Sequence, residues 1–313
     1  MDIGVALAAS TDPARTANYV DAVVDQARDA AAAGLRSAWF GQRFDYDAVT
    51  LAALVGREVP GLAVGTSAVP VFGRHPLVLG ANAVTAQAAT EGRFRLGLAI
   101  GAKFLIEEPF GVAFERPVAR LREFLAAIGP AVATGRTDFR GELVTAVTPE
   151  RGGPLPGAAP VPVLVAAMGP QALRASGELA DGILPFLAGP RTLENRIIPA
   201  LAGAARAAGR PAPRVVALVA AVVTEDPDAV RGAAADQMGF YDNVPSYAKV
   251  VAEEGASRAA DLALIGDAAA VAAGLRRYRD AGVDEIVLTQ TDLHGPEDRR
   301  RTWELAGSLT TGG

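Results

Sequence analysis

The chain has 313 residues, 50% hydrophobic and 21% charged, with a formal net charge of −5 and no cysteine. This composition is typical of a folded globular protein, and its acidic balance argues against a nucleic-acid-binding protein. The lack of cysteine excludes disulfides, thiolate metal sites and a cysteine nucleophile, and it fits a reducing cytoplasm.

The first residues, MDIGVALAAS, are apolar for only a few positions and run directly into Thr11-Asp12-Pro13. They indicate a first strand and a turn, because a signal peptide would have a basic segment before its apolar run. No charge-free apolar run reaches the roughly 18 residues of a membrane span. We therefore expect a cytoplasmic protein with neither a membrane nor a nucleic-acid partner.

From there the chain alternates short apolar runs with amphipathic, Ala-rich stretches. The apolar runs predict strands at 3–9, 37–40, 61–69, 93–101, 162–168, 181–187, 214–223 and 284–290. The stretches between them predict helices at 16–33, 46–58, 76–91, 115–134, 170–179, 190–208, 226–238 and 267–281. Gly34, Gly209 and Gly282 stand where three of these helices end, as glycine C-caps do.

Strands that are apolar on both faces and alternate with helices are typical of a parallel sheet covered on both sides. A doubly wound sheet and a (β/α)8 barrel share this order, and eight strands favour the barrel. Although 313 residues suffice for two domains, α/β barrels commonly reach this length as one. We predict a single α/β TIM-barrel domain over residues 1–313.

Two stretches interrupt the alternation and predict insertions. Residues 135–160 are rich in Gly and Pro and predict a short hairpin around FRGEL. Residues 239–266 are too long for a bare loop and predict a helix near 245–254.

In a TIM barrel the active site lies at the carboxyl ends of the strands. The residues there are Ser10, Gln42, Arg43, Val69 to His75, Gly101 to Lys103, Met168, Gly169, Leu187 to Arg191, Thr224 and Gln290 to Asp292. This set holds no Ser-His-Asp arrangement, no carboxylate pair and no histidine cluster for a metal. A wide barrel mouth with few reactive side chains favours chemistry carried by a cofactor.

Two strand ends carry a Gly-Pro turn that opens a helix. Met168-Gly169-Pro170-Gln171 and Gly189-Pro190-Arg191-Thr192 both leave backbone N–H groups free at the positive end of a helix, where an anion binds well. Taken alone, each turn more often serves only to start its helix.

Other polar residues near the strand ends have two interpretations each. His75, one of two histidines, can handle protons or can hydrogen-bond at a corner as a structural residue. Glu107 follows the fourth strand, where acidic residues usually face solvent. Tyr241 and Tyr247 can cover a flat ring or pack their own helix.

Blocks along the whole chain resemble one family. The stretches VGTSAVPVFGRHP, LGANAVTAQAATEGRFRLGLAIG, PVLVAAMGPQALRASGELADGI, AAGRPAPRVVALV and VPSYAKVVAEEG occur in the same order as in the luciferase-like monooxygenase superfamily, in its branch that uses coenzyme F420. The resemblance implies a barrel with insertions, usually a homodimer, that holds a deazaflavin or flavin at the strand ends.

The resemblance also implies positions for the cofactor. Ser67 and Ala68, followed by Val69, match residues against the ring, often at a bulge with a non-prolyl cis peptide. The turn of Met168, Gly169, Pro170 and Gln171 matches the phosphate-binding turn. The region from Gly189 to Arg191 matches a second phosphate contact, and Gly101 with Ala102 would face the reactive side of the ring.

Two positions depart from the family pattern. Relatives carry an acidic residue or a histidine where this chain has Ala102, and alcohol-oxidising relatives carry a histidine near Gln42. Neither a methyl group nor an amide acts as a general base, which argues against alcohol oxidation. Lys103 and Glu107 are candidate replacements, with His75, water or an insertion tyrosine as other proton sources; the opposing interpretation is that Lys103 and Glu107 face solvent.

The leading hypothesis is a coenzyme F420-dependent reductase that transfers hydride to an activated C=C or C=N bond of a small-molecule substrate. The alternative is an FMN-dependent monooxygenase on the same barrel, which oxygen uptake would distinguish. A third reading is a cofactor-binding protein with impaired catalysis, since Ala102 and Gln42 occupy two active positions.

Overall fold

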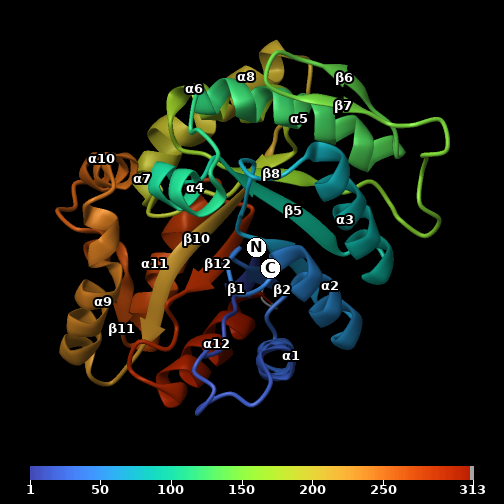
Figure 1. Cartoon of the computed structure of the whole chain (residues 1–313). Helices are drawn as coiled ribbons and strands as arrows, with labels where there is room; N and C mark the ends of the chain where they lie inside the picture. The colour runs from blue at the N-terminus through green and yellow to red at the C-terminus, as the bar shows by residue number, and fades with distance from the viewer. Residues whose placement is uncertain (311–313) are drawn as a thin grey trace.

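The computed structural model describes residues 1–310, and it contains a closed parallel barrel surrounded by helices (Figure 1). The barrel strands are β1 (Asp2–Ala6), β2 (Ser37–Phe40), β3 (Ala63–Thr66), β5 (Phe94–Ala99), β8 (Val163–Ala166), β9 (Gly182–Ile183), β10 (Arg214–Val223) and β12 (Glu285–Thr289). Each strand pairs in parallel with its neighbour, and pairing of β9 with β10 through Gly182 and Arg214 closes the ring. The predicted TIM barrel is confirmed.

Helices cover the outside of the barrel. They are α1 (Tyr19–Ala32), α2 (Ala48–Glu58), α3 (Pro76–Ala89), α4 (Lys103–Phe110), α5 (Pro117–Thr134), α6 (Pro170–Leu179), α7 (Pro190–Thr192), α8 (Ile198–Ala207), α9 (Pro227–Asp242), α10 (Pro245–Glu254), α11 (Ala268–Asp280) and α12 (Pro296–Thr310). A π-helical turn, Leu193–Ile197, joins α7 to α8. The three predicted C-terminal glycines, Gly34, Gly209 and Gly282, all have positive φ, as glycines just past a helix end do.

Sequence reasoning missed two of these helices, α4 and α12. Helix α4 is short, contains Pro109, and lies where a loop was expected. Helix α12 begins with the charged run PEDRRR, which has little apolar periodicity.

The predicted third strand, 61–69, is interrupted. Strand β3 ends at Thr66, the Ser67–Ala68 peptide bond is cis, and the chain resumes as β4 (Val69–Pro70), which pairs with β5. The backbone therefore bulges at the mouth of the barrel.

Both insertions form the elements expected of them. In the first, β6 (Asp138–Arg140) and β7 (Thr145–Val147) make an antiparallel hairpin on the outside of the barrel near α5 (Figure 1). In the second, α10 is followed by a 3-10 turn, Ala259–Leu262, and by β11 (Leu264–Gly266), which pairs with β10. The strand β11 was not predicted.

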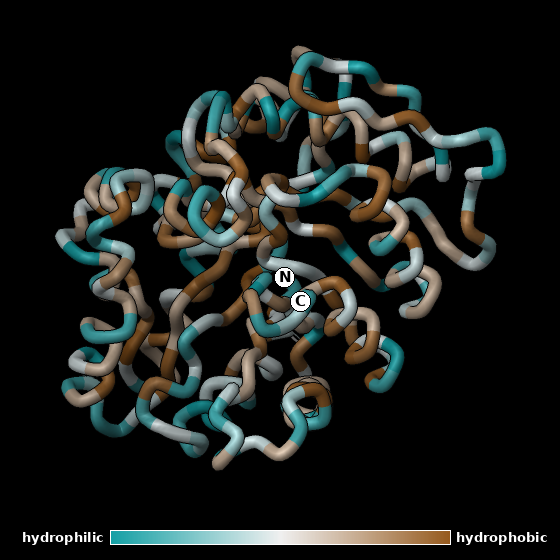
Figure 2. Tube along the Cα trace, in the orientation of Figure 1, coloured by the Kyte–Doolittle hydropathy of each residue, from teal (hydrophilic) through white to brown (hydrophobic). Residues whose placement is uncertain are grey.

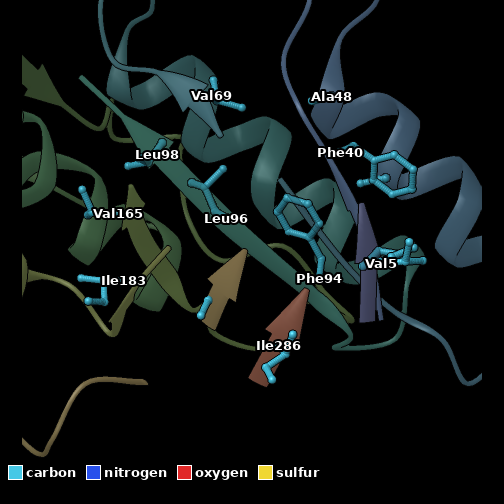
Figure 3. Close-up of a cluster of buried hydrophobic side chains, with 14 of the residues drawn as sticks. Val5, Phe40, Ala48, Val69, Phe94, Leu96, Leu98, Val165, Ile183 and Ile286 are labelled. Atoms are coloured by element: carbon cyan, nitrogen blue, oxygen red, sulfur yellow. The ribbon is translucent and has the colours of Figure 1, made fainter. Parts of the chain in front are cut away.

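Side chains from the strands form two apolar layers. Outward side chains, such as Phe94, Leu96 and Leu98 of β5, pack under the helices (Figure 3). Inward side chains, including Trp39 and Leu184, fill the middle of the barrel. Gly65 makes room for Trp39, because a Cβ there would lie 2.6 Å from the indole ring. The central strands accordingly carry mostly hydrophobic colour, whereas the outer helices alternate (Figure 2).

Below Trp39, a fully buried carboxylate closes the base of the barrel. Glu285 accepts hydrogen bonds from Ser37 Oγ (2.5 Å), Trp39 Nε1 (3.1 Å) and Arg214 Nη2 (3.1 Å), and it pairs with Arg95. Buried charge is tolerated when it is paired and hydrogen-bonded in this way. Within residues 1–310, no helix has the length and apolar character that crossing a bilayer requires.

Candidate cofactor and active site

A cavity of about 650 Å³ opens at the carboxyl ends of the barrel strands. Its floor consists of small inward side chains at the last residue of three strands. These are Ala6 of β1, Ala99 of β5 and Ala166 of β8. The layer below holds bulky residues such as Trp39 and Leu164. The change from large to small side chains along the strands creates the space.

The bulge after β3 forms one side of this cavity. Ser67 and Ala68 both line it, and the non-prolyl cis peptide expected between them is present. Val69 does not line it: its side chain is fully buried, and its backbone pairs with Leu98 in the sheet.

Aromatic residues form the opposite wall. Phe186 follows β9, while Tyr241 of α9 and Tyr247 of α10 come from the second insertion. Ring centroids lie 5.0 Å apart for Phe186 and Tyr241, and 5.3 Å apart for the two tyrosines, with edge-to-face geometry. Burial raises the pKa of both phenols, that of Tyr247 to about 12. Both hydroxyl groups therefore stay protonated at neutral pH.

Polar residues gather at the end of the cavity formed by β12 and α12. Thr289, Gln290, Asp292 and Arg299 line this end, beside Trp303. Thr289 Oγ1 and Gln290 Oε1 are buried and have no hydrogen-bond partner among the described residues. Such atoms are costly to bury, so their position in a cavity points to a ligand.

Sequence reasoning missed Thr289 and Arg299. Thr289 could have been found, because it has the same parity along β12 as the inward-facing Glu285 and Val287. Arg299 lies four residues before Trp303 on a helix that was not predicted.

The two Gly-Pro turns differ in the structure. At α6, Gly169 is the N-cap without a side-chain capping bond, and a Cβ there would meet nothing within 4 Å. Gln171, one residue after Pro170, faces a shallow outer groove beside α5. The carbonyl of Met168 accepts a hydrogen bond from Arg196 Nη1 (2.8 Å), so a cation stands next to this open turn.

At α7 the equivalent donors are already bonded within the protein. The carboxylate of Glu254 accepts from Arg191 N (3.2 Å), Thr192 N (2.8 Å) and Thr192 Oγ1 (2.8 Å). A Cβ at Gly189 would overlap this carboxyl group, and the Arg191 guanidinium donates to the Glu253 carbonyl instead. The expected phosphate contact at Gly189 and Arg191 is thus filled by the C-terminal end of α10.

His75 lies outside the cavity lining. It is the N-cap of α3: its Nδ1 accepts from Leu77 N (3.2 Å), and its Nε2 donates to the Thr145 carbonyl (2.9 Å). Both ring nitrogens are engaged in joining α3 to the hairpin, which matches the structural interpretation of this residue.

Gln42 is likewise occupied. Its amide nitrogen donates to the carbonyls of Arg43 (2.6 Å) and Tyr46 (2.7 Å), and its oxygen accepts from Ala48 N (3.1 Å). It shapes the loop before α2 and lines a neighbouring cavity of about 410 Å³.

The residues after β5 also lie away from the cavity lining. Gly101 has positive φ, and Ala102 is the N-cap of α4. Lys103 is 69% exposed, 3.5 Å from Glu107, whose carboxylate also accepts from Phe114 N. The geometry supports the solvent-facing interpretation of Lys103.

Comparison with known proteins agrees with this architecture. The model of the luciferase-like monooxygenase family matches residues 1–285. An uncharacterized protein of Mycobacterium tuberculosis is 30% identical over 78% of this chain and 74% of its own length. A putative coenzyme F420-dependent oxidoreductase of the same organism is 28% identical over 51% of this chain and 49% of its own length.

Solved structures with similar folds include enzymes with either cofactor. The coenzyme F420-dependent tetrahydromethanopterin reductase of Methanopyrus kandleri has a TM-score of 0.76 at 19% identity, covering 98% of this chain and 97% of its own. The oxygenating component of 3,6-diketocamphane monooxygenase of Pseudomonas putida, in complex with FMN, has a TM-score of 0.78 at 18% identity, over 98% and 97%. On the family match and the shared barrel, this chain belongs to the luciferase-like monooxygenase family and is an oxidoreductase of flavin or deazaflavin type.

Proposed function

We propose that the protein is a coenzyme F420-dependent reductase that transfers hydride to an activated C=C or C=N bond of a small molecule. The observation that carries this proposal is the composition of the cavity lining. Within residues 1–310 it holds no histidine or lysine, and its one carboxylate, Asp292, follows β12 and not β2 or β5, after which Gln42 and Ala102 stand in place of the bases of relatives. Alcohol oxidation needs a base to remove the hydroxyl proton, whereas hydride addition to a polarised double bond needs only a proton donor.

The residues present fit a deazaflavin. Its flat ring would lie between the Ser67–Ala68 bulge and the wall of Phe186, Tyr241 and Tyr247. The open turn at Gly169 would hold the phosphate with backbone N–H groups at the start of α6. When bound in its reduced form, the cofactor supplies a hydride.

The chain's own part in the reaction is to shape the cavity and to donate a proton. Tyr241 and Tyr247 line the cavity, and burial keeps their Oη atoms protonated. A phenol can donate to the anion that hydride addition leaves on the substrate, and it regains the proton from solvent. Use of coenzyme F420 by the putative oxidoreductase from Mycobacterium tuberculosis, as its name states, supports the choice of cofactor. A homodimer in solution stays a prediction from the family resemblance.

The test is a parallel titration of the purified protein with oxidised coenzyme F420 and with FMN, followed by cofactor fluorescence. The proposal expects tight binding of the deazaflavin and weak binding of FMN. A preference for FMN, followed by oxygen uptake once a flavin reductase is supplied, would instead identify a monooxygenase.

A variant tests whether the turn at Gly169 binds the phosphate of the cofactor. Gly169→Asp places a carboxylate against the donors of α6, as Glu254 does at α7, and should weaken cofactor binding at least about tenfold. Gly232→Asp, on the outer face of α9 where a Cβ also meets nothing within 4 Å, is the matched control. Equal binding by both variants would place the phosphate elsewhere.

A further inference from the structure

Three successive arginines, Arg299 to Arg301, lie in the first two turns of α12, and they differ in their partners. Arg300 pairs with Glu297 and Glu304, and Arg301 pairs with Glu225, Glu297 and Asp298. Arg299 has no carboxylate partner among residues 1–310, and it alone of the three lines the cavity. Its guanidinium carbon lies 5.3 Å from the centre of the Trp303 ring, within cation–π distance.

The platform under Arg299 is held firmly. Trp303 is 4% exposed, and its Nε1 donates to Thr291 Oγ1 (3.1 Å), so the indole is fixed to the loop after β12. A guanidinium stacked on a fixed ring loses little side-chain entropy when it binds an anion. The side chain is therefore preorganised at the cavity end.

A second observation at the same end points to a ligand. Thr289 is 7% exposed, lines the cavity, and its Oγ1 has no partner among the described residues. A hydroxyl can donate to an oxygen of a bound ligand, and the cost of leaving it unpaired is then removed.

The charges at this end indicate the kind of ligand. Arg43, the other arginine of the lining, is already bonded to Asp45. The carboxylate of Asp292 also lines this end without an ion pair to Arg299, so one cation is free to bind an anion, and a second negative charge on the ligand would be repelled. This balance suits a singly charged carboxylate, which the planar guanidinium can bind through two hydrogen bonds, better than a doubly charged phosphate.

We infer that Arg299, with the hydroxyl of Thr289, forms a subsite for a carboxylate group of the substrate. The inference rests on the proposed function, because it assigns the substrate class of that same cavity: an unsaturated compound that carries a carboxylate. Deazaflavin binding and carboxylate binding are separate measurements, so the failure of one is distinguishable from the failure of the other.

The experiment measures equilibrium binding of crotonate and cinnamate, of their amides, and of phenyl phosphate, to the protein with and without bound cofactor. Binding is followed by tryptophan fluorescence and calorimetry. If the subsite binds a carboxylate, each carboxylate should bind at least about tenfold tighter than its amide. This preference for the carboxylate should decrease as salt is added.

Variants separate the subsite from a general charge effect. Arg299→Gln should abolish the preference for the carboxylate and leave deazaflavin affinity unchanged. Arg300→Gln, which removes the neighbouring charge on the outer face of α12, should keep the preference. Thr289→Val should weaken carboxylate binding by a smaller factor than Arg299→Gln.

Four results would overturn the inference. These are no saturable binding of either carboxylate, equal affinity for carboxylate and amide, equal loss in the two arginine variants, and tighter binding of phenyl phosphate than of cinnamate. If the protein binds carboxylates through Arg299 but no deazaflavin, the subsite stands and the proposed function falls.

Discussion

Inward-facing polar side chains have hydrogen-bond partners at the base of the barrel and lack them at its mouth among the described residues. Strand β12 contributes Glu285 at the base of the barrel and, two inward-facing positions further along the strand, Thr289 at the mouth. At the base the carboxylate is surrounded by Ser37, Trp39, Arg95 and Arg214, whereas at the mouth the Thr289 hydroxyl has no partner among residues 1–310. The chain itself therefore satisfies the buried carboxylate at the base, and we propose that a bound ligand satisfies the hydroxyl at the mouth.

Removing the carboxylate at the base should have the largest effect on stability. Glu285→Ala leaves the charges of Arg95 and Arg214 without their buried partner, and we expect a loss of about 3–5 kcal/mol in the free energy of unfolding. Denaturant unfolding measures it. Glu142→Gln, which removes an exposed pair with Arg116, should leave the midpoint unchanged. Similar unfolding midpoints for both variants would mean that the buried network around Glu285 does not stabilise the fold.

Filling the mouth should affect binding far more than stability. Ala166→Phe places a ring on the cavity floor, where the side chain is exposed to the cavity, and should weaken cofactor binding at least about 100-fold. Fluorescence titration measures binding, and thermal unfolding checks the fold. Ala133→Phe on the exposed face of α5 is the control. Undiminished binding by Ala166→Phe would move the cofactor out of this cavity.

Removing the carboxylate that fills the α7 turn should have an intermediate effect on the free energy of unfolding. Glu254→Ala removes the acceptor for Arg191 N, Thr192 N and Thr192 Oγ1, and should cost about 1–2 kcal/mol, as the loss of a helix cap does. The freed N–H groups should also bind inorganic phosphate, detectable by calorimetry. Asp280→Ala, which removes an exposed carboxylate paired with Arg279 at the C-terminal end of α11, leaves the turn filled and should gain no phosphate binding. Equal phosphate binding by the two variants would contradict the assignment of Glu254.

Replacing the Thr289 hydroxyl should have the smallest effect on the free energy of unfolding, and this change should increase it. Thr289→Val replaces the unpartnered hydroxyl with a methyl group and should stabilise the protein by up to about 1 kcal/mol. The matched change at Thr66 should destabilise it by about 1–3 kcal/mol, because Thr66 Oγ1 donates to the Gly97 carbonyl and accepts from Gly97 N. Denaturant unfolding compares the two; destabilisation by Thr289→Val would show that this hydroxyl is satisfied.

Much of the fold could be predicted because its signals are local. The strands at 37–40 and 214–223 and the helix at 245–254 have the predicted bounds, since apolar runs and Pro or Gly at their ends mark them directly. Helix α12 escaped because its first turns are charged, and its packing rests on Trp303 and Ala306, too few apolar positions to form a pattern.

The features of the candidate site were likewise predictable only where their signals are local in the sequence. The barrel and the two Gly-Pro turns could be predicted from the residues themselves, because each depends on residues adjacent in the chain or on the order of elements, and the bulge at Ser67 and Ala68 was implied by the family resemblance. Only the tertiary structure decided that Glu254 fills the turn at Gly189, since the two lie more than sixty residues apart. It likewise decided that Arg299 faces the cavity unpaired while its neighbours do not, because an ion pair depends on which charges the fold brings within reach.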